Sequence, residues 1–474
     1  MKKILFPIRD RRNRLRIDSF AEDIISNTAP RKSPDTKPPS TYPLKKESRI
    51  LIMFALSTGV YYLRLSLRPM KKWRIIKGVI LALVAIMVLA GCGEEATHKE
   101  KVFVNLPEIN NSLFLNLDSA IIARKATELD KKFLSLQRLT GFNGTVLFSE
   151  KGQIILRKAY GFANVRRHRD SLTTHSAFQL ASVSKMFCAM AVMILKTEGK
   201  IDYDEDIRTY LPRFPYEGVT CRLLMTHRSG LPRYMSLSLA HWNNKRIPLN
   251  NDDVVDLFVK YKPDVYFKPN HGFHYCNTNY ALLACVVEAV TKKHFDEFVQ
   301  ERIFKPLGMN DSFIYNMRND STVPLYVEKG VPGYYKRGWR WRRMENDYLN
   351  GVLGDKNVYT SVEDIYKYDK ALDNFTLVPD SVLREAFEKG SPAYWRRKDN
   401  YGFGWRLKTS MDSVAYHFGW WKGFRTFYIR DMRHQRTLVV LTNKDKGPGS
   451  ANFWNIIKSD TLPLGYSSDI NRRH

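Results

Sequence analysis

The stretch FQLASVSKMFCAMAVMILKTEGKI, residues 178–201, decides the fold, because it joins a serine, a lysine three residues later and a long apolar helix. Ser182 and Lys185 are about one helical turn apart, so their side chains share one face at the start of that helix. A serine hydroxyl is a weak nucleophile at neutral pH and needs a base, which a desolvated lysine can provide. Alone the spacing is weak, since an N-cap serine with an exposed lysine has the same pattern.

A second polar pair precedes another apolar helix in HYCNTNYALLACVVEAVTKK, residues 274–293. Tyr275 and Asn277 lie two apart, and in extended backbone such residues point to the same side. Tyr275 can share the base role with Lys185, and Asn277 offers a donor and an acceptor to orient Lys185 or a substrate amide. By itself the pair also fits a loop tyrosine that packs on the core.

A third segment, YHFGWWKGF at 416–424, carries His417 and Gly419 on a stretch that we expect to form an edge strand. The ordered set SxxK, YxN and HxG resembles the serine β-lactamase and penicillin-binding-protein superfamily, especially class C β-lactamase-like esterases and peptidases. The resemblance spans residues 134–443. Its supporting segments are RLLMTHRSGLP (222–232), IFKPLGMNDS (303–312), GDKNVYTSVEDI (354–365) and YGFGW (401–405).

This resemblance implies a role for each residue of the three patterns. Ser182 becomes the nucleophile, with Lys185 and Tyr275 as its base and proton relay. The backbone N–H groups of Ser182 and Trp420 become the oxyanion hole, a kind of site typically worth a factor of about 10²–10³ in rate. The implied substrate-binding residues are Asn277, His417, Gly419 and Trp420. No cofactor and no metal are expected.

His417 departs from the usual pattern, because β-lactamases of this superfamily usually carry lysine at that position. A histidine with the reference pKa of about 6.5 is largely neutral at pH 7.4. We therefore expect His417 to hydrogen-bond an ester or peptide group but to capture a β-lactam carboxylate poorly, with recovery as it protonates near pH 6.

The expected function is hydrolysis of a small ester, amide or D-amino-acid peptide, including peptidoglycan-derived peptides, through an acyl-enzyme at Ser182. One alternative is a β-lactamase or a cell-wall DD-peptidase. Another is a non-hydrolytic sensor that binds penicillin or peptidoglycan. Because all three motifs are intact, a degenerate binder is disfavoured.

The expected fold is α+β, of the β-lactamase/transpeptidase type, over residues 118–465. Strand composition gathers near the two ends of this span, in the hairpin sequence of residues 144–164 and in residues 401–442, while residues 200–390 are loop-rich and helical. We expect an antiparallel sheet flanked by helices, with the mostly helical segment inserted as a second lobe and a cleft between them. Helical spacing also predicts a first helix from Asp118 to Leu136.

Charge and cysteines exclude several other classes. The formal net charge is +28, but residues 1–92 hold 19 Lys and Arg against 6 Asp and Glu. The remaining excess has no nucleic-acid motif beside it, so no nucleic-acid partner is expected. The five cysteines show no CxxC pair and no accompanying His cluster, which indicates neither a zinc site nor a disulfide framework.

Three smaller features stay open or structural in this interpretation. GYYKRGWRWRR at 333–343 is either a rim that grips an anionic substrate or a basic loop facing membrane or solvent. Lys356 and Asn357 stand where many relatives have a glycine pair and are expected to narrow or charge the cleft edge. His227 is read as structural, because the SxxK arrangement already supplies a base.

The N-terminal region contains a predicted targeting signal. From Met70 a basic MKKWRIIK precedes fourteen residues without charge, 78–91, and LAGC at 89–92 closes the segment. These are the parts of a lipoprotein signal peptide (residues 70–92). Cys92 would carry the lipid, residues 93–117 would be a tether, and the protein would be a membrane-anchored lipoprotein of the cell envelope, periplasmic or surface-facing. Residues 1–69 are expected to be a gene-model extension or disordered; a two-pass anchor and an uncleaved signal anchor are the alternatives.

Overall fold

The computed structural model describes residues 50–56, 59–65, 119–317, 329–392 and 399–458, in two units that divide at residue 100. In the first unit, β1 (Ile50–Leu56) and β2 (Gly59–Leu65) form an antiparallel hairpin. The expectation that residues 1–69 are a gene-model extension or disordered, and the alternative of a two-pass anchor, stay predictions. Residues 66–118, which include Cys92, the predicted signal peptide (70–92) and the predicted tether (93–117), lie outside the described residues.

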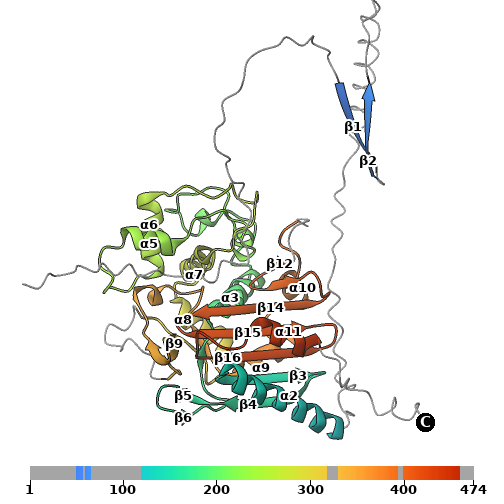
Figure 1. The fold of residues 1–474 in the computed structure, drawn as a ribbon. Coiled ribbons are helices and arrows are strands. Elements are labelled where there is room, and N and C mark those ends of the chain that lie inside the picture. Colours follow the sequence, from blue (N-terminus) through green and yellow to red (C-terminus); the bar gives the residue numbers. More distant parts are fainter. Residues whose placement is uncertain (1–49, 57–58, 66–118, 318–328, 393–398, 459–474) are drawn as a thin grey trace, which may run out of the picture. The chain divides into compact units, whose positions relative to one another are not determined.

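The second unit is built on a seven-stranded antiparallel sheet with strand order β12-β13-β14-β15-β16-β3-β4 (Figure 1). Its strands are β3 (Gly144–Glu150), β4 (Gln153–Tyr160), β12 (Asp399–Tyr401), β13 (Arg406–Lys408), β14 (Val414–Trp421), β15 (Phe424–Asp431) and β16 (Arg436–Thr442). β16 pairs with β3 along its whole length, so strands from the two ends of the domain are neighbours within the sheet. The predicted α+β arrangement is confirmed.

Alternation along the central strands separates two apolar layers. In β3, Leu147 faces one core, whereas Val146 and Phe148 face the other. Since successive strand residues point to opposite faces, both faces of the sheet must be covered. Helices α2 (Ser119–Thr140) and α11 (Ser450–Lys458) contact strands of the sheet and share the second core.

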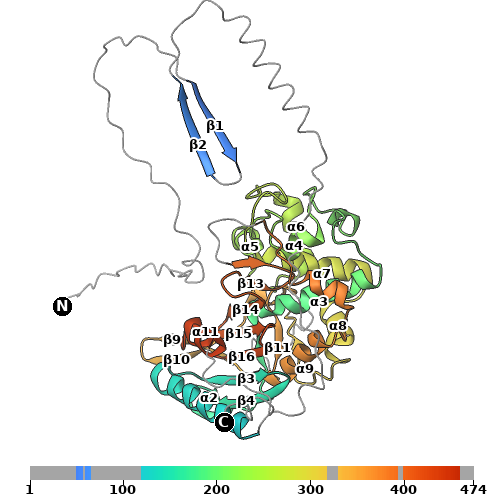
Figure 2. The same cartoon turned by 90° about the vertical axis from the view of Figure 1, so that its right-hand side faces the viewer.

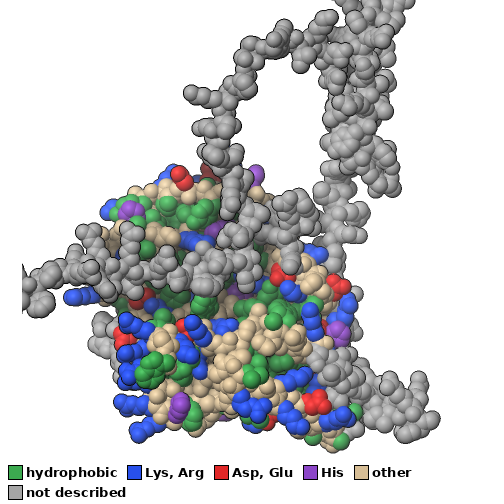
Figure 3. All heavy atoms as spheres, viewed as in Figure 1, with side chains coloured by type: hydrophobic (Ala, Val, Ile, Leu, Met, Phe, Trp, Pro, Cys, Tyr) green, Lys and Arg blue, Asp and Glu red, His purple; other side chains and the backbone are tan. Residues whose placement is uncertain are grey.

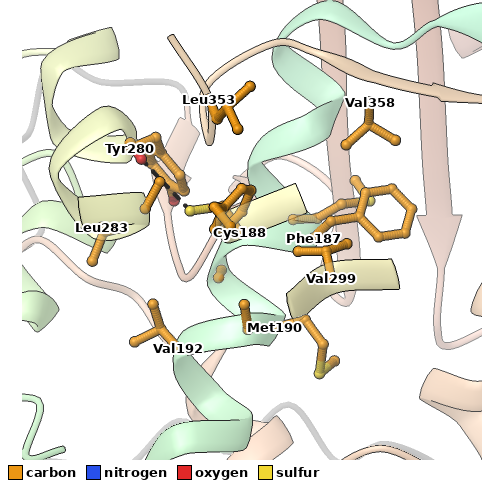
Figure 4. Packing of buried hydrophobic residues seen from close by; sticks show 14 of the residues in the cluster. Phe187, Cys188, Met190, Val192, Tyr280, Leu283, Val299, Leu353 and Val358 are labelled. Carbon is orange, nitrogen blue, oxygen red and sulfur yellow. Dashed lines mark hydrogen bonds between the residues drawn. The ribbon is translucent and has the colours of Figure 1, made fainter. Parts of the chain in front are cut away.

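The opposite core is organised around α3 (Lys185–Thr197), which is apolar on all sides. Such a helix must be enclosed by other elements. Figure 4 shows α3 packed between α7, α8 and β11, with the Cys188 thiol donating to the carbonyl oxygen of Tyr280 at 3.6 Å. This close packing around α3 holds the residues at its start in place.

The remaining elements form the inserted lobe and small sheets. The helices are α4 (Cys221–Met225), α5 (Tyr234–His241), α6 (Asn251–Tyr261), α7 (Asn277–Thr291), α8 (Phe295–Val299), α9 (Val362–Asp373) and α10 (Asp380–Glu385). The one-turn segments are η2 (Ala181–Ser184), η3 (Ile207–Thr209), η4 (Gln300–Phe304) and η5 (Tyr348–Gly351). The short strands are β5 (Phe162–Asn164), β6 (Arg169–Ser171), β7 (Phe178–Gln179), β8 (Phe313–Ile314), β9 (Gly333–Arg337), β10 (Arg340–Met344) and β11 (Val358–Thr360). Figure 2 shows the helical lobe, green to yellow, above the sheet.

Two details of the described part bear on function. The basic segment at 333–343, expected as a loop, is the β9–β10 hairpin. None of the helices that the structure describes is both long and apolar enough to cross a membrane.

Candidate active site

Ser182 lies in the tight turn η2 between strand β7 and helix α3. The preceding residue, Ala181, has φ +50°, a left-handed conformation that costs a non-glycine residue free energy and persists where surrounding structure imposes it. The turn leaves Ser182 partly exposed at the start of α3, while Lys185 is fully buried one turn later.

The Lys185 ammonium joins the first two sequence motifs. Its Nζ donates to Ser182 Oγ at 3.2 Å, to Asn277 Oδ1 at 2.8 Å and to the Asp355 carbonyl oxygen at 2.9 Å. These contacts use all three donors of an ammonium, so the amine has a single defined direction toward the serine. Asn277 is the first residue of α7, and its Oδ1 accepts a hydrogen bond from Lys185. This contact fits one of the two roles expected of Asn277, the orientation of Lys185.

Tyr275 lies beside this pair, with the Lys185 Nζ 5.1 Å from the centre of its ring. Its ring also packs against buried His227 at 4.3 Å between centroids. The Tyr275 hydroxyl is buried and has no hydrogen-bond partner among the described residues. Leaving a buried hydroxyl unpaired typically costs about 1–3 kcal/mol. An unused donor on a ring beside Lys185 is compatible with the expected proton relay, which stays a prediction.

His227 packs against Tyr275 and contacts the residues around the start of α7. Its Nδ1 accepts from the Cys276 backbone N–H at 3.2 Å and lies 3.0 Å from Asn279 Nδ2. Burial, reinforced by the charges of Lys185 and Arg406, holds the pKa of His227 well below its usual range. The ring is thus a neutral packing element, in line with the structural reading from sequence.

His417 forms its hydrogen bonds within the protein. It is fully buried, with Nε2 2.9 Å from Tyr401 Oη and Nδ1 2.9 Å from the Phe418 carbonyl oxygen. Because a carbonyl only accepts, Nδ1 carries the proton and Nε2 accepts from Tyr401. Both ring nitrogens are therefore occupied within the protein in this structure, and the expected hydrogen bond from His417 to a substrate stays a prediction.

The expected protonation of His417 near pH 6 needs correction. Burial first, and then the positive charges of Arg406 and Lys185, hold the pKa of His417 well below 6.5. A neutral imidazole beside two cations stays neutral at pH 6, since protonation would add a third buried charge.

The second half of β14 provides the close approach to the nucleophile. β13 pairs only with Ala415 and Tyr416, so the edge-strand prediction holds from His417 onward. A Cβ at Gly419 would overlap the carbonyl oxygen of Leu180, just before the turn that carries Ser182. Glycine therefore lets β14 reach that turn and brings along Trp420, whose side chain is 44% exposed. The oxyanion role of the Ser182 and Trp420 N–H groups remains a prediction.

Arg406 belongs to this site and was missed in the sequence. Its guanidinium carbon lies 4.9 Å from the centre of the Tyr275 ring and 5.8 Å from that of Tyr401. Within the described part of the chain it forms no ion pair with a carboxylate. The only sequence signal was its position directly after YGFGW, and the fold was needed to show that β13 runs beside His417.

Lys356 lies beneath the site rather than at the cleft edge, which corrects the expectation for this residue. Its buried Nζ donates to Asp355 Oδ1 at 3.0 Å and to Tyr234 Oη at 2.8 Å. Tyr234 in turn donates to Asp355 Oδ2 at 3.1 Å. Burial lowers the pKa of Lys356, against the attraction of Asp355. Asn357 is buried as well and donates to backbone carbonyls.

Metal-ligating side chains and thiols also occur in the rest of the described chain. Within the described ranges, no group of three or more His, Cys, Asp or Glu residues is arranged to hold a metal ion. The described cysteines, Cys188, Cys221, Cys276 and Cys285, are free thiols in buried positions.

Comparison with known proteins gives one consistent answer. The Beta-lactamase family model matches residues 135–461. Penicillin-binding protein 4* of Bacillus subtilis is 34% identical over 68% of this chain and 72% of that protein, and a D-aminopeptidase of Cereibacter sphaeroides is 26% identical over 68% and 61%. The crystal structure of a penicillin binding protein from Bacillus halodurans superposes with a TM-score of 0.60 at 26% identity, covering 70% of this chain and 98% of that one. The chain belongs to the beta-lactamase family and is a serine acyl hydrolase.

Proposed function

We propose that the chain hydrolyses a small amide, ester or D-amino-acid peptide through a covalent acyl-enzyme on Ser182. The observation that carries this proposal is the fixed position of Lys185 Nζ, 3.2 Å from Ser182 Oγ and held by Asn277 and the Asp355 carbonyl. A nucleophile within hydrogen-bond reach of an oriented base is the arrangement that covalent catalysis needs.

Each proton in this scheme has a place to go. In the reactive form one member of the Lys185–Tyr275 pair is deprotonated, and it takes the Ser182 Oγ proton as Oγ bonds to the substrate carbonyl carbon. The same base then protonates the leaving amine or alcohol as the bond to that group breaks. Water next attacks the acyl-enzyme and gives its proton to the base, which returns it to Ser182 Oγ as the acid product leaves.

Charge around the site narrows the substrate class. Arg406 is a cation without a carboxylate partner among the described residues, whereas Asp355 is already bonded to Lys356 and Tyr234. Asp355 is thus not free to pair with a substrate ammonium, whereas Arg406 is available to a substrate carboxylate. We therefore favour an acyl substrate that is neutral or bears a carboxylate close to the scissile bond.

Turnover by the purified protein tests the reaction. A chromogenic ester, a D-amino-acid amide and a cephalosporin are compared for wild type and Ser182→Ala, with peptide mapping of a fluorophosphonate adduct. We expect continuous turnover of the ester or amide and labelling at Ser182 alone. A single burst without turnover would point to the sensor alternative, and labelling that survives Ser182→Ala would refute the nucleophile.

We also propose that Cys92 carries a lipid that anchors the protein in the cell envelope, with the hydrolase domain facing the periplasm or the outside. LAGC after a basic start and an uncharged run supports this proposal. Membrane fractionation of wild type and Cys92→Ser, with N-terminal sequencing, tests it. Processing and anchoring that persist in Cys92→Ser would refute it, as would a mature protein that retains residues 1–69.

A further inference from the structure

The β9–β10 hairpin presents a tryptophan at its tip. Arg337 pairs with Arg340, which leaves Gly338 and Trp339 as a two-residue loop with φ +60° at the glycine. Glycine at the first loop position is a common hairpin turn, but loop tips are normally polar. Trp339 is nevertheless 77% exposed.

Positive charge surrounds this tryptophan. The Arg340 guanidinium lies 4.2 Å from the centre of the Trp339 ring. The exposed cations of the hairpin are Lys336, Arg337, Arg340, Arg342 and Arg343. Counting only partners that the structure describes, Lys336, Arg337, Arg340 and Arg342 form no ion pair.

A neighbouring hairpin extends the charge. Tyr334 Oη of β9 donates to Asn164 Oδ1 of β5 at 3.5 Å, which links the two hairpins. The β5–β6 turn region adds exposed Arg166, Arg167 and Arg169. We call these eight cations together with Trp339 the basic face. Figure 3 shows Lys and Arg side chains crowded over the part of the surface where Figure 1 places β9, β5 and β6.

The β9–β10 hairpin is attached to the domain at its base by a buried residue and by close backbone contacts. Tyr334 is buried and its backbone N–H donates to the Asn443 carbonyl at 2.9 Å. A Cβ at Gly333 would overlap the Lys422 carbonyl, so the base of the hairpin lies directly against the β14–β15 turn. That turn follows Trp420, which places the hairpin base at the same end of β14 as the catalytic turn.

A solvated basic surface explains the charges but not the tryptophan. An apolar side chain of this size at a projecting tip is unfavourable in water unless it is buried on binding. Tryptophan prefers the interface between lipid headgroups and acyl chains, and each nearby Lys or Arg gains free energy against anionic headgroups. We propose that the basic face docks on an anionic lipid bilayer, with Trp339 in the headgroup layer and the arginines against lipid phosphates.

The fluorescence of Trp339 in the full chain would report docking. The protein is reconstituted in vesicles of phosphatidylcholine alone, or of equal parts phosphatidylcholine and phosphatidylglycerol, both with brominated acyl chains that quench nearby tryptophan. We expect extra quenching in the anionic vesicles, and Trp339→Phe should remove it. Trp339 is one of several tryptophans in the chain, so the lost component is a minor share of the total emission. Any quenching of tryptophan emission near the N-terminus of the chain is the same in every variant, so it cancels when the variants are compared.

A charge variant gives the second arm. Replacing Lys336, Arg337, Arg340 and Arg342 with Gln should abolish the extra quenching, because each cation near an anionic surface is worth about a factor of five in binding. The matched control replaces four exposed cations elsewhere, Lys131, Arg138, Lys268 and Lys305, and should keep it. High salt should weaken the effect in wild type.

Two outcomes would overturn the proposal. The first is equal quenching in both lipid compositions, or quenching unchanged in Trp339→Phe, which would mean that the tip does not meet the bilayer. The second is binding of soluble polyphosphate that depends on the four cations while Trp339 is never quenched, which would assign the basic face to an anionic polymer instead. Ester turnover by Trp339→Phe in detergent should equal wild type, so a folding defect is detectable separately.

Discussion

The Arg406 guanidinium carbon lies 4.9 Å from the centre of the Tyr275 ring, so β13, and not the third motif, provides a cation beside Tyr275. His417, which occupies that motif, is buried, neutral and bonded on both ring nitrogens. The expectation of weak carboxylate capture rested on His417 alone and stays a prediction, to which Arg406 on the adjoining strand adds a cation. Selectivity at this site is a question about Arg406.

Replacing Arg406 should change selectivity more than rate. In Arg406→Gln, we expect kcat/KM for an acylated D-dipeptide with a free carboxylate to fall about tenfold relative to its C-terminal amide. The reason is that a charge-assisted hydrogen bond is worth about 1.5–3 kcal/mol against about 1 for a neutral one, and 1.4 kcal/mol is a factor of ten. Arg406→Lys should retain part of the preference. Equal losses for both substrates would show that Arg406 only supports the fold.

The two buried histidines should make the protein acid-sensitive. His227 and His417 have pKa values well below 6.5, so the folded state binds fewer protons than the unfolded chain as the pH falls through about 6.5. The stability they contribute is complete above that pH and is lost below it, by up to about 1.4 kcal/mol per histidine per pH unit. Denaturant unfolding at pH 7.5 and 5.5 measures the loss. His417→Gln should show a smaller pH dependence than wild type, and an unchanged slope would place the effect elsewhere.

At the scale of elements, glycine at position 419 decides whether β14 and η2 can touch. Gly419→Ala should separate the strand from the turn, because the new Cβ would overlap the Leu180 carbonyl. We expect the rate of Ser182 acylation to fall by about 10²-fold, the usual cost of losing an oxyanion donor. Gly449→Ala is the control, since its Cβ would meet nothing within 4 Å. Normal acylation in Gly419→Ala would argue against Trp420 as a donor.

The Asp355–Lys356 pair links the loop before β11 to Lys185 through a backbone carbonyl. Lys356→Met should destabilise the fold by about 3–5 kcal/mol, because it leaves the Asp355 carboxylate buried without its cation. Adding Asp355→Asn should recover much of that loss and keep the carbonyl that holds Lys185. Chemical denaturation measures both variants. If the double variant is as unstable as the single one, the buried charge is not the cause.

Elements with strong periodicity were predictable from the sequence, and contacts between distant strands were not. The first helix and the 144–160 hairpin were found close to their predicted positions because helical spacing and a turn with Lys151 and Gly152 are local signals. The β9–β10 hairpin was read as a loop, since five cations hide its alternation. Arg406 and the placement of His417 depend on which strands neighbour each other, which no local pattern encodes.

At the scale of the whole molecule, the sheet separates the core that holds the catalytic residues from a second core. Ser182 and Lys185 belong to the side of the sheet on which α3 packs, whereas α2 and α11 enclose the other core. In β15, Tyr428 faces the first core and Phe427 the second, so a single strand serves both layers. Changes in one layer should reach the other only through the backbone of the sheet.

Phe453 tests this separation. Its ring lies in the core away from the site, 4.5 Å from Phe427 and 6.5 Å from Phe133 between centroids. Phe453→Ala should cost about 3–5 kcal/mol of unfolding free energy, as large buried aromatics do. Below the unfolding transition, kcat should stay within about twofold of wild type, because no contact of Phe453 reaches α3 and a factor of two is only about 0.4 kcal/mol of barrier.

The matched change on the other side is Phe187→Ala. Phe187 is buried within α3, two residues after Lys185, and packs on Tyr368 at 4.5 Å and Phe304 at 5.5 Å between centroids. A cavity there should lower stability by a similar amount and also release the start of α3, so kcat should fall at least tenfold, which corresponds to about 1.4 kcal/mol of barrier. Denaturant unfolding and ester turnover on the same samples measure both quantities. If Phe453→Ala reduces kcat as much as Phe187→Ala does, the two layers are mechanically coupled, and the sheet transmits strain that this arrangement of cores is expected to isolate.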